Sequence, residues 1–543
     1  MGFLVSAMRI GLAQINTTVG DFEGNKRLIL DAYHKLVSDG AELVLTPELA
    51  VTGYPPRDLV FRSGFVRRSE ETIQELARET GPVPLVVGFV QHNEKLRGKP
   101  FRNAAAVLHG GKVVAVRHKS LLPTYDVFDE ARYFEPADDV TPVLVGGVRL
   151  GVTICEDIWT DEYLPRPLYH VSPPNQLAEH GIDLLVNLSA SPFHAGKPEV
   201  RERMMCAVAR EIGAPIAYCN AIGGNDQLVF DGHSVIIDQA GAVTARLPGF
   251  AESIACGGLH AASSETAQIY EALVLGTRDY IRKCGFKSAV LGLSGGIDSA
   301  LTAVVAADAL GPENVMGVSM PSRYSSEGSK DDARDLARNL GIRYETVPIE
   351  PVFESLKKQM SAVFSGKPED ITEENMQSRI RGLIMMSMSN KFGHLLLTTG
   401  NKSELAVGYC TIYGDMCGGL AVISDLPKLR VYEVSRWINR DKEIIPWPSI
   451  DKPPSAELKP DQKDQDTLPP YEVLDGILEL LVEQNLSVRE VVERGFAEDT
   501  VRWIAKKIDV NEWKRHQAAP GLRVTTKAFG VGRRIPIVQK FGA

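Results

Sequence analysis

The sequence contains no long apolar run and no excess of basic residues. None of its apolar stretches approaches the roughly 18 residues that a membrane-spanning helix needs, so a membrane protein is not expected. Lysine and arginine together number 60, against 69 aspartate and glutamate residues, and the net charge is −9. This balance, without a basic tail, argues against a general nucleic-acid-binding protein.

Cysteine is scarce, with seven residues and no Cys-x-x-Cys pair. An odd number of cysteines, most in apolar contexts such as Cys206, Cys219 and Cys256, is typical of a reduced environment and offers no zinc site. Residues 1–11 do not resemble a secretory signal, so we expect a cytoplasmic protein. No Gly-x-Gly-x-x-Gly fingerprint follows a predicted strand, and no Walker motif is present, which argues against hydride transfer and γ-phosphate transfer.

The length of 543 residues suits about two to four domains. In the first half, short apolar runs alternate with stretches of helical period, which predicts a layered α/β domain over residues 1–260. The apolar runs cover residues 8–14, 42–46, 85–89, 112–116, 149–154, 183–188 and 234–238, and the helical stretches cover residues 25–38, 69–79 and 200–212.

A run of small residues at positions 257–264 marks the junction to a second domain, residues 261–543. Beyond a helix over residues 268–283, predicted strands alternate with helices, which implies parallel βαβ units and a doubly wound parallel sheet. These strands cover residues 288–293, 314–320, 344–347 and 394–398, with helices at 299–310, 329–340 and up to Phe392. Residues 448–470 are rich in proline and charge, and we expect them to form a mobile surface loop too polar to pack.

The hexapeptide Ser294-Gly-Gly-Ile-Asp-Ser299 lies between a predicted strand and a predicted helix. Backbone N–H groups and the helix dipole favour a bound anion at such a place, and two glycines allow a close approach of phosphate oxygens. Without the Walker lysine, this cradle suits pyrophosphate as a leaving group. A plain Gly-rich turn, with Ser or Asp as helix cap, is the alternative for the glycines alone.

The hexapeptide resembles the signature of the PP-loop ATP pyrophosphatases, whose sheet is of the adenine nucleotide alpha hydrolase type. Further segments resemble successive motifs of the NAD synthetase branch of that family. They are Ser326-Glu-Gly-Ser-Lys-Asp-Asp-Ala333, Glu374-Asn-Met-Gln-Ser-Arg-Ile-Arg381, Thr399-Gly-Asn-Lys-Ser-Glu404, Tyr413-Gly-Asp415 and Ser424-Asp425.

This resemblance implies ATP as a co-substrate, with Mg²⁺ as the cofactor. The ATP-binding residues that it implies are Gly292, Leu293, Ser294, Gly295, Gly296, Ile297, Asp298, Ser299 and Thr399. Asn375, Glu404, Lys428 and Lys514 would bind deamido-NAD, the two lysines bringing positive charge to the phosphates. Asp298 and Glu404 would coordinate the magnesium, because Mg²⁺ prefers hard oxygen ligands. Taken alone, Glu404 would be an ordinary solvated glutamate in the first turn of a helix.

In the first half, Glu48, Lys119 and Cys155 each follow an apolar run. Open α/β sheets build their sites at strand ends, although each residue alone would be ordinary: a buried small hydrophobe for Cys and a solvated charge for the others. Their contexts, Pro47-Glu48-Leu49, Arg117-His-Lys119-Ser-Leu-Leu-Pro and Ile154-Cys155-Glu156-Asp157, resemble the nitrilase or carbon-nitrogen hydrolase family. That resemblance implies a four-layer α-β-β-α sandwich.

The trio suits nucleophilic amide hydrolysis. Lys119 would lower the pKa of the Cys155 thiol and stabilise the oxyanion, while Glu48 would take the thiol proton and return it to the departing ammonia. The resemblance adds Glu130, in Phe128-Asp-Glu130-Ala-Arg132, as an auxiliary glutamate that orients the lysine. It also implies that Tyr125, Glu156, Ser191 and Lys197 bind L-glutamine.

Together the two halves resemble the family of glutamine-dependent NAD synthetases. The resemblance implies that the first domain releases ammonia from glutamine, and that the second adenylates deamido-NAD and lets ammonia displace AMP through a protected passage. A homo-oligomer is expected by analogy. Another PP-loop ligase would need a different glutaminase partner or a basic RNA-binding surface, and a silent nucleotide-binding scaffold would be expected to lack Cys155 or Asp298; neither pattern is seen.

Overall fold

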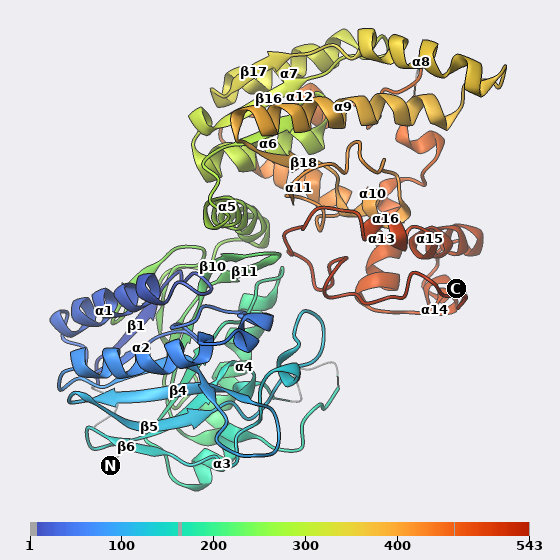
Figure 1. The fold of residues 1–543 in the computed structure, drawn as a ribbon. Coiled ribbons are helices and arrows are strands. Elements are labelled where there is room, and N and C mark those ends of the chain that lie inside the picture. The colour runs from blue at the N-terminus through green and yellow to red at the C-terminus, as the bar shows by residue number, and fades with distance from the viewer. Residues whose placement is uncertain (1–7, 161–165, 461, 542–543) are drawn as a thin grey trace. The chain divides into compact units, whose positions relative to one another are not determined.

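The computed structural model describes residues 8–160, 166–460 and 462–541. The chain divides into two compact units, the first ending at Gln268 and the second beginning at Ile269 (Figure 1). Each unit has its own sheets and its own hydrophobic core. In the part of the chain described here, no helix is both long enough and apolar enough to cross a bilayer.

The first unit contains two six-stranded sheets. In spatial order, the strands of the first sheet are β14 (Ser253–Ala255), β1 (Ile10–Gln14), β2 (Leu43–Leu45), β3 (Leu85–His92), β4 (Phe101–His109) and β5 (Lys112–His118). Those of the second sheet are β13 (Val243–Arg246), β12 (Val235–Ile237), β9 (Ile216–Asn220), β8 (Leu184–Ser189), β7 (Val148–Ile154) and β6 (Val143–Val145). Strands β10 (Ile222–Asn225) and β11 (Leu228–Asp231) form a separate antiparallel pair.

The two sheets share one apolar core. Leu12 and Leu45 of the first sheet belong to the same buried cluster as Val152 and Val186 of the second, and burying each such side chain contributes about 1.5–3 kcal/mol. Helices α1 (Phe22–Ser38) and α2 (Phe65–Glu79) pack on the other face of the first sheet, and α3 (Pro173–Glu179) and α4 (Lys197–Ile212) on that of the second. The predicted four-layer α-β-β-α sandwich is therefore confirmed.

Because layers cover both faces of these sheets, the central strands are apolar without alternation. Every residue of β2 and of β8 is buried. The covering helices instead have one apolar face, which in α1 includes Ile29, Ala32 and Leu36. Asp21 caps this helix by accepting a hydrogen bond from the backbone N–H of Gly24 at 2.9 Å.

The second unit is built on a five-stranded parallel sheet. In spatial order its strands are β17 (Arg343–Thr346), β16 (Val315–Ser319), β15 (Ala289–Gly292), β18 (Leu395–Thr398) and β19 (Leu420–Ala421). The strand order reverses between β15 and β18, and open parallel sheets bind their ligands at the carboxyl ends of the strands at such a point. The predicted doubly wound parallel sheet is confirmed.

Helix α6 (Ile297–Leu310) is buried on almost all sides, and α9 (Ile371–Phe392) places Met385 against Val290 and Leu396 of the sheet. The remaining helices are α5 (Glu265–Lys283), α7 (Glu327–Leu340), α8 (Glu350–Phe364), α10 (Lys402–Val407), α11 (Lys428–Ile438), α12 (Trp447–Asp451), α13 (Tyr471–Leu478), α14 (Val488–Glu493), α15 (Glu498–Val510) and α16 (Glu512–Arg515).

The described part of residues 448–470, which leaves out residue 461, does not form the unpacked loop that the composition predicts. Ile450 and Leu468 are buried, and the buried carboxylate of Asp464 accepts a hydrogen bond from the Tyr471 hydroxyl at 2.8 Å. The expected lack of packing is wrong because a few apolar and hydrogen-bonded side chains anchor the segment near both of its ends.

Candidate active sites

Lys119 lies between two carboxylates at the end of β5. Its Nζ is 2.8 Å from Oε1 of Glu48 and 2.7 Å from Oε1 of Glu130. All three side chains are buried, with exposures of 5% or less. Buried charges are costly unless they are paired, so this arrangement fixes the positions of all three groups.

The electrostatics of the trio keep the lysine charged. Burial alone would lower the pKa of Lys119, but the charges of Glu130 and Glu48 raise it well above its usual value. Burial raises the pKa of Glu130 to about 7, a shift that Lys119 opposes and the charge of Glu48 reinforces. The single positive charge of Lys119 is thus shared by two carboxylates, so the pair of carboxylates can accept one more proton.

The sequence contexts did not indicate the groups that hold these carboxylates. The Tyr54 hydroxyl donates to Oε1 of Glu130 at 2.9 Å. Asn103, on β4, donates from Nδ2 to Oε1 of Glu48 at 2.7 Å, and the backbone N–H of Ala190 donates to Oε2 of Glu48 at 3.1 Å. Each carboxylate therefore has a partner besides the lysine.

Cys155 follows β7 and begins a short 3₁₀ turn, Cys155–Ile158. Its φ is 45°, a left-handed conformation that is uncommon for a residue with a side chain and that clusters at functional sites. Burial, and then the charge of Glu48, raise the pKa of the thiol, whereas Lys119 lowers it. Lys119 therefore acts in the expected direction, but burial and Glu48 outweigh it, and this balance favours the protonated thiol and calls for a base.

Asp157 connects the lysine to the cysteine. Its Oδ1 accepts the backbone N–H groups of Ser120 and Leu121 at 2.9 and 2.8 Å, and its Oδ2 accepts that of Ile154 at 3.0 Å. The residues next to Lys119 and Cys155 are therefore held by one carboxylate. Burial raises the pKa of Asp157 to about 7, although the three backbone hydrogen bonds favour its charged form.

Three of the four predicted glutamine-binding residues interact with one another. Glu156, which is buried, accepts the hydroxyl of Tyr125 at 2.7 Å, and the charge of Lys197 lowers its pKa against the larger raising effect of burial. The Lys197 ammonium lies 5.7 Å from the centre of the Trp159 ring. The backbone N–H of Ser191 donates instead to the side chain of Asn220 at 2.9 Å.

In the second unit, the loop after β15 has a conformation that depends on glycine. Gly295 has a φ of 81°, and a Cβ at this position would lie 2.2 Å from the carbonyl oxygen of Ser329. The hydroxyl of Ser299 donates to the Gly296 carbonyl at 2.9 Å and accepts the backbone N–H of Ser294 at 3.3 Å. The loop ends at the N-terminus of α6, where free N–H groups favour an anion.

A cavity of about 460 Å³ lies at this loop, within the range of small-molecule sites. Its lining brings together almost all of the predicted nucleotide-binding residues. They are Gly292, Leu293, Ser294, Gly296, Ile297, Asp298, Ser299, Asn375, Thr399, Glu404, Lys428 and Lys514. Gly295 is not in this lining; its carbonyl accepts a hydrogen bond from the Ser449 hydroxyl at 3.0 Å.

The cavity contains a compact charged cluster. The buried ammonium of Lys428 bonds to Oδ2 of Asp298 and lies 3.5 Å from Oε1 of Glu404. Asn401 donates to Oδ1 of Asp298 at 3.0 Å. Burial and the charge of Asp298 raise the pKa of Glu404 to about 8, and Lys428 lowers it only in part. The cluster is thus short of positive charge.

Magnesium fits this pair of carboxylates. Within the described residues, no group of three or more His, Cys, Asp or Glu side chains is arranged to hold a metal ion. Mg²⁺ bound with a nucleotide needs only one or two protein carboxylates, because phosphate oxygens and water complete its shell. Asp298 and Glu404 supply that number, and a divalent cation would relieve the repulsion that raises the pKa of Glu404.

Comparison with known proteins shows the same division of the chain. Residues 9–268 match the carbon-nitrogen hydrolase family, and residues 269–518 match the NAD synthase family. A glutamine-dependent NAD(+) synthetase from Synechocystis sp. is 48% identical over 98% of this chain and 99% of that protein. The chain belongs to the family of glutamine-dependent NAD(+) synthetases.

Other relatives agree with this membership. The glutamine-dependent NAD(+) synthetase from Thermotoga maritima is 43% identical over 98% of this chain and 99% of its own length. The structure of the Acinetobacter baumannii glutamine-dependent NAD(+) synthetase, solved with adenosine diphosphate, has a TM-score of 0.77 and 37% identity, and the match covers 97% of this chain and 98% of that one.

The sequence analysis did not identify some of the residues that line the cavity of the second unit. Lys452, Glu457 and Asp464 line the cavity and come from the segment that was expected to be a free loop. The Lys452 ammonium donates to Asp332 at 2.9 Å. Burial raises the pKa of Asp464, which Lys428 lowers in part. The polar composition of this segment could have indicated these residues, because the charged side chains of Lys452, Glu457 and Asp464 line the cavity.

Two of the predicted deamido-NAD-binding residues also make hydrogen bonds to a loop of the protein itself. The Lys514 ammonium donates to the backbone carbonyls of Gly408 and Cys410, at 2.9 and 3.1 Å. Oδ1 of Asn375 accepts the Thr411 hydroxyl at 2.8 Å. Both side chains therefore also fix the loop that follows α10.

Proposed function

We propose that this chain converts deamido-NAD to NAD, using ATP and ammonia that its first unit releases from L-glutamine. The observation that carries the proposal is the presence, in one chain of this family, of a buried Glu48–Lys119–Cys155 constellation and a phosphate loop bordering a charged cavity. The reaction is that of a ligase that forms a carbon–nitrogen bond.

In the first unit, Glu48 accepts the proton of the Cys155 thiol as the sulfur attacks the amide carbon of glutamine. The raised pKa of the thiol makes this base necessary. The Lys119 ammonium stabilises the oxyanion of the tetrahedral intermediate, a contribution whose loss typically costs ~10²–10³ in rate. Glu48 returns the proton to the departing ammonia, and water then hydrolyses the thioester to glutamate.

The amino-acid end of glutamine is held by groups of complementary charge. The buried Glu156 carboxylate, bonded to Tyr125, binds the α-ammonium group, and the Lys197 ammonium pairs with the α-carboxylate. Ser191 completes the site as a hydrogen-bonding group.

In the second unit, the carboxylate of deamido-NAD attacks the α-phosphate of ATP, and pyrophosphate leaves. The N–H groups of residues 294–299 bind the pyrophosphate at the N-terminus of α6, with Thr399 beside the nucleotide. Ammonia then attacks the acyl carbon of the adenylate, and AMP departs. Asn375, Glu404 and Lys514 border the part of the cavity assigned to deamido-NAD.

Lys428 neutralises part of the negative charge that Asp298 and Glu404 bring to the cavity. Asp298 and Glu404 would hold Mg²⁺, which when bound neutralises charge on the phosphates of ATP. A homo-oligomer, a cytoplasmic location and a protected transfer of ammonia complete the proposal by analogy with the family.

Product analysis tests the function directly. Incubation with ATP, Mg²⁺, deamido-NAD and glutamine should give NAD, AMP, pyrophosphate and glutamate, the first three in equal amounts. Omission of deamido-NAD is the control, and it should give neither AMP nor NAD. ADP with phosphate in place of AMP with pyrophosphate would contradict the adenylation step.

Tyr54→Phe should weaken amide hydrolysis without abolishing it. The Tyr54 hydroxyl stabilises the charged form of Glu130, so its removal should raise the pKa of Glu130 above about 7. Glu130 pairs with the Lys119 ammonium in its charged form, so the site should be fully active only above the pKa of Glu130. The acid limb of the pH profile for glutamate release should therefore move to higher pH, and the rate at pH 7 should fall about tenfold.

Tyr33→Phe is the matched control, because the hydroxyl of Tyr33, on α1, bonds to the backbone of Val83 and Gly81 and to none of the trio. A pH profile of Tyr54→Phe identical to that of Tyr33→Phe would show that the Tyr54 hydrogen bond does not tune the lysine site.

A further inference from the structure

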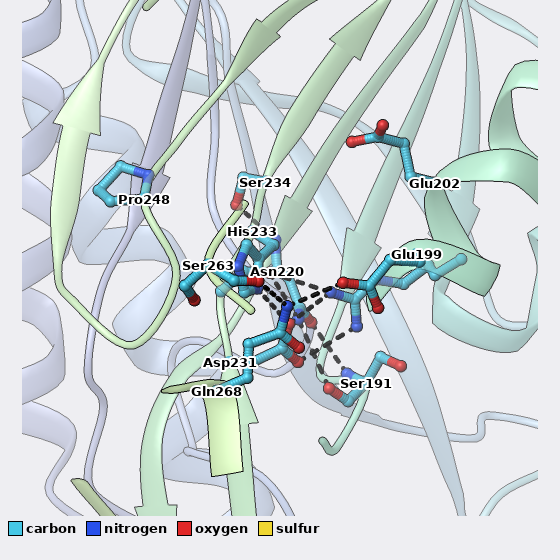
Figure 2. Close-up of polar contacts among 12 residues, drawn as sticks. Ser191, Glu199, Glu202, Asn220, Asp231, His233, Ser234, Pro248, Ser263 and Gln268 are labelled. Carbon is cyan, nitrogen blue, oxygen red and sulfur yellow. Dashed lines mark hydrogen bonds and ion pairs between the residues drawn. The ribbon is translucent and has the colours of Figure 1, made fainter. Parts of the chain in front are cut away.

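A buried polar network lies beside the predicted glutamine-binding residues of the first unit. Figure 2 shows Asn220, Asp231 and His233 gathered with Ser191, while Glu202 stands apart from them. The network centres on an ion pair between Arg201, on α4, and Asp231, at the end of β11, whose side chains are 1% and 0% exposed. The reaction described above uses none of these charges.

The ion pair is bidentate, and the Asp231 carboxylate has a further hydrogen-bond partner. Nη1 and Nη2 of Arg201 donate to the two carboxylate oxygens of Asp231 at 3.2 and 2.6 Å. Nδ1 of His233 is 2.7 Å from Oδ2 of the same carboxylate, and the Arg201 guanidinium lies 5.4 Å from the centre of the Tyr218 ring. A planar guanidinium in this geometry holds its partner in one orientation.

Asn220 connects this network to Ser191. It accepts the backbone N–H of Ser191 at 2.9 Å and donates Nδ2 to the Gly232 carbonyl at 2.9 Å. Gly232 follows Asp231, and its carbonyl also accepts Nη2 of Arg201 at 3.4 Å. Asn220 is fully buried, so these partners determine where the backbone of Ser191 lies.

Arg201 also connects the network to Lys197. The two residues are four positions apart in α4 and therefore lie on one face of the helix. Lys197 is the first residue of α4, whose N-cap, Gly196, offers no side-chain hydrogen bond. The ion pair with Asp231 is thus a tertiary anchor for the N-terminal part of this helix, one turn beyond Lys197.

A buried ion pair is seldom the most stable choice for a core, since apolar residues of similar volume often serve as well. Apolar residues cannot, however, hold their neighbours in one fixed orientation as the hydrogen bonds of this ion pair do. We propose that Asn220, Arg201 and Asp231 are positioning residues that fix Ser191 and Lys197 to receive the amino-acid end of glutamine. The proposal rests on the glutamine hydrolysis proposed above and adds the residues that set its substrate affinity.

Asn220→Ala is the first test. It should raise the KM for glutamine about tenfold or more while changing kcat by less than about threefold, because Ser191 binds the end of the substrate that does not react. NAD synthesis from ammonium should be unchanged. Replacing the ion pair as a unit, with Arg201→Met and Asp231→Leu together, avoids leaving one charge of the pair buried without its partner. This double variant should also raise the KM for glutamine and change kcat little.

Arg246→Met is the matched control. Arg246 forms a bidentate ion pair with Glu202, the neighbour of Arg201 on α4, at 2.7 Å for both contacts. Its loss should leave the KM for glutamine within about twofold of the parent value, because this pair holds neither Ser191 nor Lys197.

Calorimetric titration of glutamine into proteins that also carry Cys155→Ala separates binding from turnover. The Kd should rise about tenfold with Asn220→Ala and stay constant with Arg246→Met. An unchanged Kd with Asn220→Ala would overturn the positioning role, as would an equal rise with Arg246→Met. Failure of the full-length parent to bind and hydrolyse glutamine would instead overturn the proposed function, and the inference with it.

Discussion

Cys155→Ala is expected to abolish NAD formation from glutamine and to leave NAD formation from ammonium salts intact. In the proposed mechanism the sulfur is the protein group that bonds to the amide carbon, so its loss should lower glutamine-dependent synthesis by at least about 10³-fold. Ammonium salts supply ammonia directly to the adenylate, which the second unit makes without the thiol. The rate with ammonium should rise with pH, because only the uncharged form is nucleophilic.

Cys219→Ala is the matched control for this variant. Cys219 is another buried free thiol of the first unit, and its side chain donates to the backbone carbonyl of Leu45 rather than facing the Glu48–Lys119 pair. Glutamate release and NAD formation should be measured for both variants with each nitrogen donor. If Cys155→Ala lost ammonium-dependent synthesis while remaining folded, the division of labour between the units would be contradicted. If it kept glutamine-dependent synthesis, another cysteine would be the nucleophile.

Much of this site could be predicted because its residues follow strands. Lys119 and Cys155 come directly after β5 and β7, and Glu48 lies in the turn that follows β2. Strand ends of this kind can be located from apolar runs in the sequence. The local sequences around them carried the family resemblance. The contacts of Tyr54 and Asn103 could not be predicted in this way, because they depend on which residues the fold brings within hydrogen-bond distance of a carboxylate.

The protonation state of Cys155 shows the same limit. A lysine nearby was expected to depress the pKa of the thiol, and Lys119 does act in that direction. The net shift is upward because burial and the negative charge of Glu48 outweigh it. The sign of such a shift depends on depth and on the balance of two neighbouring charges, and neither can be derived from spacing along the chain.

The fold was predictable where the layers impose a simple pattern. Apolar runs locate β2, β8 and β15, which are covered on both faces, and the alternation of strands and helices indicates the parallel sheet. The apolar runs did not single out β4, whose second and third residues are the buried polar residues Arg102 and Asn103. Their side chains are paired in the fold, with Asp138 and Glu48, and such pairings cannot be derived from composition.

Asp298→Ala should abolish NAD formation with both nitrogen donors, in contrast to Cys155→Ala. The substitution removes the carboxylate that bonds to Lys428 and Asn401 and that would hold magnesium beside the phosphates. We expect a loss of at least about 10²–10³-fold in NAD formation, typical of removing a group that stabilises developing charge. Release of glutamate from glutamine should persist, since Glu48, Lys119 and Cys155 are unaffected.

Asp308→Ala is the matched control, because Asp308 lies on the same helix α6 and bonds to the hydroxyl of Tyr270 rather than to any group of the cavity. It should keep NAD formation within about threefold of the parent value, as is usual for a substitution away from the reacting groups. Measurements of AMP, pyrophosphate and NAD across a series of Mg²⁺ concentrations separate two cases. A rate of Asp298→Ala within tenfold of the parent at saturating Mg²⁺ would remove Asp298 from the metal site. A rate that stays low at every concentration would show that the charge at this position, next to Lys428, is required for adenylation itself.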